Sequence, residues 1–113
     1  MKIVKLKLGT SDLDKTVDYL IQNLQFDYEN HSSGMSILAF EDYYFRNNSA
    51  QLNMIIAKKE NSCIIIDIIG GAGGSGLLNI NWWSEKGYTN KVKKIMYKYI
   101  EEFGLTLEQM ESS

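Results

Sequence analysis

The stretch that decides the fold is 63–83, which reads CIIIDII at residues 63–69, GGAGGSG at 70–76 and LLNINWW at 77–83. Five of the nine glycines fall within residues 70–76, between two runs in which side chains alternate along the chain. Alternation with a period of two is typical of β-strands, so the sequence predicts two strands joined by a glycine-rich loop or bend. We expect this loop to be the most mobile element and the first place to look for a ligand.

Three glycines of this loop match a nucleotide-binding spacing. Gly71, Gly73 and Gly76 fit GxGxxG, the fingerprint of dinucleotide sites. Such a site needs a helix directly after the glycines, because the N-terminus of that helix holds the pyrophosphate. The pattern of residues 77–83 predicts a strand there instead. The sequence therefore disfavours a nucleotide site, and we expect no cofactor.

Hydrophobic periodicity assigns the other elements on both sides of this stretch. Strict alternation predicts a strand over residues 2–8, and helical spacing predicts an amphipathic helix over residues 12–24 with Ser11 as its N-cap. A second helix ends at Gly104, where we expect a left-handed C-cap, and residues 105–113 are predicted to be a tail that forms an extra turn or is disordered. The remaining predicted strands cover residues 25–31, 35–45, 52–57, 63–69 and 77–83.

These elements predict a single α+β domain over residues 1–104, with the order β-α-β(4-5)-α. Short connections between the middle strands require a curved antiparallel sheet, and the apolar faces predict two layers with both helices on one face. The order resembles the TATA-binding-protein-like and helix-grip architectures, in which the sheet wraps a C-terminal helix. This resemblance carries no motif and no function. The residues expected beneath the helices are Val4, Leu6, Leu8, Leu52, Met54, Ile56, Ile64, Ile66, Ile68, Leu78, Ile80 and Trp82.

The other face of the sheet is expected to be left open by the helices. The alternation places Ile65 and Ile69 on it, on either side of Asp67, which we expect in solvent or paired with a lysine of residues 2–8. Trp83 is expected on this face or at its rim. Apolar side chains on an open face indicate a cover, and a second copy of the chain is the simplest one. The polar residues expected there are Lys5, Lys7, Asn53, Asp67, Asn79 and Asn81.

Composition and single residues argue against several function classes. His31 is the only histidine and Cys63 the only cysteine, so neither a zinc site nor an internal disulfide is expected, and nothing beside His31 in the sequence supplies a nucleophile. The net charge of −2 and the single arginine disfavour nucleic acid, and the five lysines of residues 86–98 are interpreted as a solvated helix face. The chain has neither a membrane-spanning stretch nor a signal peptide, so we expect a soluble, cytoplasmic, bacterial-type protein.

The function predicted from these features is a non-catalytic binding or interaction module that forms a homodimer. The alternative is a small-ligand carrier or an enzyme, with its site between the sheet and the C-terminal helix near residues 70–76. No catalytic residue, metal, cofactor or membrane contact is predicted. The candidate residues for binding a ligand or partner are Gly71, Gly73, Gly74, Gly76, Trp83, Ile65, Asp67 and Ile69.

Overall fold

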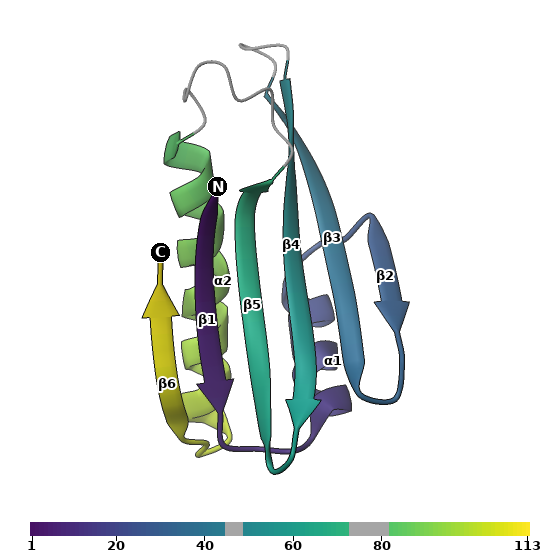
Figure 1. The fold of residues 1–113 in the computed structure, drawn as a ribbon, viewed down its shortest axis with the longest axis vertical. Coiled ribbons are helices and arrows are strands. Elements are labelled where there is room, and N and C mark those ends of the chain that lie inside the picture. The colour runs from purple at the N-terminus through teal and green to yellow at the C-terminus, as the bar shows by residue number, and fades with distance from the viewer. Residues whose placement is uncertain (45–48, 73–81) are drawn as a thin grey trace.

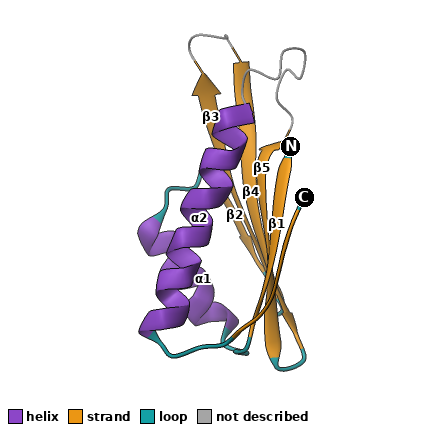
Figure 2. Ribbon diagram, turned by 90° about the vertical axis from the view of Figure 1, so that its left-hand side faces the viewer, coloured by secondary structure: helices purple, strands orange, loops and turns teal. Residues whose placement is uncertain are grey.

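The computed structural model of the chain describes residues 1–44, 49–72 and 82–113, and it has the α+β class that the sequence predicts. Six strands form one antiparallel sheet in the order β2-β3-β4-β5-β1-β6 (Figure 1). Both helices lie against the same face of this sheet (Figure 2). The elements are β1 (Lys2–Leu8), α1 (Leu13–Asn23), β2 (Tyr28–His31), β3 (Met35–Tyr44), β4 (Ser49–Glu60), β5 (Cys63–Ala72), α2 (Trp82–Glu102) and β6 (Leu107–Ser112).

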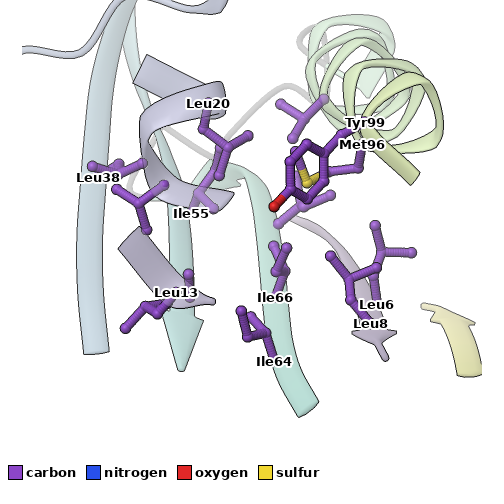
Figure 3. Packing of buried hydrophobic residues seen from close by; sticks show 14 of the residues in the cluster. Leu6, Leu8, Leu13, Leu20, Leu38, Ile55, Ile64, Ile66, Met96 and Tyr99 are labelled. Carbon is purple, nitrogen blue, oxygen red and sulfur yellow. The ribbon is translucent and has the colours of Figure 1, made fainter. Parts of the chain in front are cut away.

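The core lies between the helices and the middle of the sheet. Alternate residues of β1 and β5 point into it, as predicted, and Leu20 of α1 with Met96 and Tyr99 of α2 close it from the other side (Figure 3). Each of these three side chains is at most 1% exposed. Complete burial of one such apolar side chain contributes about 1.5–3 kcal/mol to stability. The fully buried sheet residues include Leu6, Leu8, Leu38, Ile55, Ile64, Ile66 and Ile68.

The face assignment predicted for β4 is wrong. Ile55 and Ala57 lie beneath the helices with no exposed surface, whereas Leu52, Met54 and Ile56 are half-buried residues of the open face. The cross-strand register fixes this, because Ile55 pairs with the buried residues Leu38 and Ile68. Asn53, expected on the open face, is 1% exposed on the helix side. The β4 sequence has apolar residues on both faces, so alternation alone did not determine which face turns inward.

The glycine run does not begin with a loop. Gly70 and Gly71 belong to β5, and the register of β4 with β5 shifts between Leu52 and Met54. Gly71 has φ +78°, a left-handed conformation that favours glycine, and its N–H donates to Asn53 Oδ1 at 3.1 Å. An extra residue with such a conformation is typical of a glycine β-bulge, which bends the strand. Gly71 therefore shapes the sheet.

The strand expected over residues 77–83 is contradicted at its last two residues, the part of it that the structure describes. Trp82 and Trp83 are the first residues of α2, and residues 77–81 lie outside the described part of the chain. The buried positions of α2 are spaced at helical intervals through Thr89, Val92 and Met96. This longer periodic stripe determines the helix, whereas the alternation of residues 77–83 covers only seven residues.

The ends of the helices are fixed by local hydrogen bonds. Asp12, rather than the predicted Ser11, is the N-cap of α1, and its side chain accepts from the Lys15 N–H at 3.1 Å. Gly104 has φ +62°, as expected for a left-handed C-cap. The N–H groups of Gly104 and Leu105 donate to carbonyls of Glu101 and Ile100, the hydrogen bonds of a Schellman motif.

The C-terminal residues were predicted to be a tail, and this is corrected by the structure. Leu107–Ser112 forms β6, which pairs with β1 at the edge of the sheet. Its side chains are mostly exposed, so the hydrophobic pattern that identifies a strand is weak here. The Ser113 N–H donates to the Ile3 carbonyl at 2.9 Å and completes the pairing.

The face assignment of β4 is tested by two matched substitutions. We expect Ile55→Ala to lower the free energy of unfolding by about 3 kcal/mol, because it leaves a cavity in the core, and Ile56→Ala to lower it by about 1 kcal/mol. Urea unfolding at low protein concentration measures both. Equal losses, or a larger loss for Ile56→Ala, would show that the face predicted from sequence is correct after all.

Two glycines of α2 and its C-cap give a second test, because their substitution is expected to change the free energy of unfolding in opposite directions. Gly104→Ala forces a side chain into the left-handed region and should lower the free energy of unfolding by about 1 kcal/mol. Gly87 lies exposed within α2 with nothing within 4 Å of an added Cβ, so Gly87→Ala should raise it by about 0.5–1 kcal/mol. Thermal and urea unfolding should therefore show changes in the free energy of unfolding of opposite sign for the two variants. Changes of the same sign would contradict the assigned backbone conformations.

Candidate functional site

The open face of the sheet carries a continuous apolar row across five strands. Cross-strand partners share a face of a sheet, and the register pairs Ile3 with Ile69, Ile69 with Met54, Met54 with Ala39, and Ala39 with Tyr28. Neither helix reaches this side (Figure 2). Tyr28 is 53% exposed, and Ile3, Ile69 and Met54 are half-buried. We call these five residues the apolar row.

The neighbouring rows of the same face extend this surface. One row runs from Asp67 to Ile56 and Ile37, and the next contains Ile65 between two lysines. Asp67 lies 3.7 Å from Lys5 Nζ, which confirms the predicted pairing with a lysine of the first strand. Both side chains keep part of their surface exposed, so this ion pair contributes little to stability by itself.

Charged side chains lie at both ends of the open face. At the end near the β4–β5 turn, Lys7 and Lys58 flank Ile65. Lys7 Nζ lies 3.9 Å from Glu108 Oε1, and Lys58 Nζ lies 3.3 Å from Glu60 Oε2. Both lysines therefore form surface ion pairs at this end of the sheet. At the other end, Glu41 is exposed and pairs across the strands with Leu52.

A serine, a histidine and a glutamate are linked where β2 meets β3. Ser36 Oγ is 2.8 Å from His31 Nδ1, and His31 Nε2 is 3.0 Å from Glu29 Oε1. No nucleophile beside His31 was predicted, yet the β2–β3 hairpin brings Ser36 to the cross-strand position opposite it. The order of groups is that of a catalytic triad, but Ser36 is 4% exposed, so a substrate carbonyl has no access to its oxygen. The network fixes the edge strand β2 to β3.

A groove lies on the helix side, where the end of α1, the second and third turns of α2 and β3 meet. Its volume is about 530 Å³. The lining mixes aromatic and aliphatic side chains with amides, one carboxylate and one ammonium group, as small-molecule sites do. The lining residues are Gln22, Asn23, Leu24, Gln25, Phe40, Asp42, Gly87, Tyr88 and Lys91.

Several buried polar atoms in and beside this groove have no hydrogen-bond partner. They are Tyr88 Oη, Gln51 Oε1 and Asn53 Nδ2. Burial raises the pKa of Tyr88, which keeps the hydroxyl neutral. Gln51 and Asn53 are 2% and 1% exposed, and their cross-strand partners on the same face are Asp42 and Phe40 of the groove. Unpaired buried polar groups are rare in proteins, and these three atoms lie beneath the surface and not in the open part of the groove.

The residues predicted from sequence do not all come together. Ile65, Asp67 and Ile69 lie side by side on the open face, in β5. Gly71 is the bulge residue of β5, Gly73, Gly74 and Gly76 lie outside the described residues, and Trp83 belongs to α2 on the opposite side. The groove residues were not predicted, because they come from segments far apart in the sequence and share no motif.

The described residues do not support the dinucleotide fingerprint. The strand predicted after the glycines is contradicted at Trp82 and Trp83, which belong to a helix, and its first residues, 77–81, lie outside the described part of the chain. The fingerprint also needs β5 to lie in a parallel sheet, whereas β5 is antiparallel to both of its neighbours. In addition, Gly71, which would form the phosphate turn, is a residue of β5.

The described residues contain no group of three or more His, Cys, Asp or Glu side chains that could hold a metal ion. Within the same part of the chain, neither helix is long and apolar enough to cross a membrane. Cys63 is buried, and its Sγ lies 3.1 Å from the carbonyl oxygen of Glu60.

Comparison with known proteins identifies a family. The model of a family of unknown function, DUF6054, matches residues 14–100, which is well over half of the chain, so the chain belongs to this family. The matched segment contains all of the described residues that line the groove. No curated protein and no solved structure matches the chain, so the TATA-binding-protein-like and helix-grip order stays a prediction.

Two tyrosines test whether the Tyr88 hydroxyl is unpaired. Tyr99 Oη is buried and lies 2.9 Å from Thr16 Oγ1, so Tyr99→Phe should lower the free energy of unfolding by about 1 kcal/mol. Tyr88→Phe removes a hydroxyl without a partner and should leave the stability unchanged or raise it by up to about 1 kcal/mol. Urea unfolding compares the two variants. A loss for Tyr88→Phe as large as that for Tyr99→Phe would mean that Tyr88 has a partner in the folded protein.

Proposed function

We propose that this member of the DUF6054 family is a non-catalytic interaction module that pairs with a second copy of itself through the open face of its sheet. The observation that carries this proposal is the apolar row Ile3–Ile69–Met54–Ala39–Tyr28. The open face of an antiparallel sheet ordinarily alternates to polar residues, because water covers it. Here the middle of that face is apolar, which favours a protein cover.

The size of the face supports a dimer. Four strands of about seven residues, together with the four residues of β2, give a patch of roughly 500 Å² on each copy, from the usual strand spacing and rise. Two such patches together bury roughly 1,000 Å², which reaches the ~1,000 Å² expected of a specific interface. Burial of this apolar surface supplies the main driving force.

The charges at the two ends of the face support a second copy as the partner. Glu41 and Lys58 lie at opposite ends, about 20 Å apart by the six-residue separation of Lys58 and Leu52 along β4. A two-fold axis that lies between two stacked sheets and runs across the strands exchanges these ends. Glu41 of each copy then lies over Lys58 of the other, so the face is complementary to itself.

The dimer is tested by sedimentation equilibrium of the wild type and of two lysine variants. The wild type should sediment with twice the mass of one chain. Ile69→Lys and Met54→Lys place a charge in the middle of the face, where it stays solvated in the monomer, and each should weaken association about 100-fold or more. Tyr97→Lys is the control, because Tyr97 is 37% exposed on α2.

The orientation is tested by a charge exchange. Glu41→Lys should weaken the dimer about tenfold, and the double variant Glu41→Lys/Lys58→Glu should restore it. A wild type that stays monomeric at high micromolar concentration contradicts the proposal. So does a folded Ile69→Lys variant that associates as tightly as the wild type. Failure of the charge exchange alone overturns the orientation and leaves the face as the interface.

A further inference from the structure

We infer that a pocket between α1 and the C-terminal end of α2 binds a quaternary ammonium group. We call it the cation pocket, and it lies on the helix side of the sheet, away from the proposed dimer face (Figure 2). The inference therefore does not rest on the proposed function. The pocket is lined by Lys15, Asp18, Tyr19, Gln22 and Phe103.

Two aromatic walls of the cation pocket meet nearly at a right angle. The ring planes of Tyr19 and Phe103 are inclined by 87°, and their centroids are 6.3 Å apart. Tyr99, which is 1% exposed, packs against both rings from the buried side, with centroid distances of 4.9 Å to Tyr19 and 5.3 Å to Phe103. A corner of aromatic rings is the arrangement with which proteins hold quaternary ammonium ligands.

Helical spacing and local hydrogen bonds fix these walls. Lys15 and Tyr19 are four residues apart on α1, and Tyr99 and Phe103 are four residues apart at the end of α2, so each pair lies on one side of its helix. The Phe103 N–H donates to the Tyr99 carbonyl at 3.1 Å. The Tyr19 hydroxyl donates to Glu102 Oε2 at 3.2 Å, which links the two helices beside the pocket. The walls therefore stand in place without a ligand.

The protein itself places a cation in this pocket. Lys15 Nζ lies 3.7 Å from the centroid of the Phe103 ring, well within the distance at which a ring face attracts a positive charge. A lysine ammonium is strongly hydrated and sits on a flexible stem, and Lys15 is exposed, so it turns into water at little cost. The ring face that it covers then becomes available. Lys15 thus marks the position that we assign to the charged group of the ligand.

The charge around the pocket favours a cation over a neutral molecule. Asp18 lines the pocket, and Glu102 is held at its edge by Tyr19. The last turn of α2 contains no basic residue, so the negative pole of this helix is not neutralised there by a residue of α2.

The walls select among cations. Aromatic ring faces offer no strong hydrogen-bond acceptor, so a cation without N–H groups loses least when it leaves water. A quaternary ammonium group meets this condition, and its methyl groups pack against the rings of Tyr19 and Phe103. The pocket volume of about 360 Å³ lies within the range of small-molecule sites.

NMR titration of the ¹⁵N-labelled full-length protein tests the inference with two matched probes. Choline carries a quaternary ammonium group, and 3,3-dimethylbutan-1-ol has the same shape with carbon in place of the charged nitrogen. We expect choline to shift the amide signals of Tyr19, Gln22 and Phe103, and the neutral probe to bind about tenfold more weakly. A short peptide with trimethyllysine is the third probe. Tighter binding of the peptide would assign the ligand to a modified protein, and tighter binding of choline would assign it to a small molecule.

Two pairs of variants assign the contacts. Phe103→Leu keeps an apolar side chain but removes the ring, so choline should bind about fivefold more weakly. Tyr97→Leu is its control, because Tyr97 is also an exposed aromatic residue and does not line the pocket. Lys15→Gln removes the competing cation and should tighten choline binding about threefold. Lys94→Gln makes the same change of charge outside the pocket and should leave the affinity nearly unchanged.

Several results would overturn the inference. One is the absence of shifts around the cation pocket at about 50 mM choline, where even a weak complex is populated. Another is equal binding of choline and its neutral analogue, which would indicate an apolar crevice without charge recognition. A third is a Lys15→Gln variant that binds choline no more tightly than Lys94→Gln does. Far-UV circular dichroism shows whether each variant is folded, and none of these outcomes depends on whether the protein is a dimer.

Discussion

The structure depends on β5, a central strand that is apolar on both of its faces. Ile64, Ile66 and Ile68 are completely buried beneath the helices, while Ile65 and Ile69 emerge on the other side. Both faces of β5 therefore carry apolar side chains that are stabilised by burial. The two helices cover only one of these faces (Figure 2). The uncovered side is the physical reason for proposing a second copy of the chain.

The sequence was sufficient to predict the local structure where the alternation or spacing of apolar residues had only one interpretation. In β1, lysines separate the apolar residues, so the buried face was predicted correctly, and Gly104 was correctly expected as a left-handed C-cap. In β4 the interpretation failed, because Ile55 and Ile56 compete for the core and polar Asn53 lies on the buried face. Register with the neighbouring strands decides that competition, and register is a property of the whole sheet.

Candidate functional residues were likewise predicted correctly as a group only where a single element holds all of them. Ile65, Asp67 and Ile69 were predicted together because one strand holds all three. The groove joins α1, β3 and α2, and the contact of His31 with Ser36 depends on how the β2–β3 hairpin closes. Such sites come from tertiary packing, and no spacing along this chain indicates them. Trp83 was misplaced because a short alternating run resembles a strand until the helix that follows is known.

The central claim is that a second copy covers the open face, and an isotope-filtered NOE experiment tests it most directly. A mixture of ¹³C-labelled and unlabelled protein reports only contacts between different copies. The account predicts intermolecular NOEs from the methyl groups of Met54, Ile56 and Ile69, and their loss on dilution below the dissociation constant. Intermolecular NOEs confined to other surfaces, or none at a concentration at which the protein is dimeric, would contradict it.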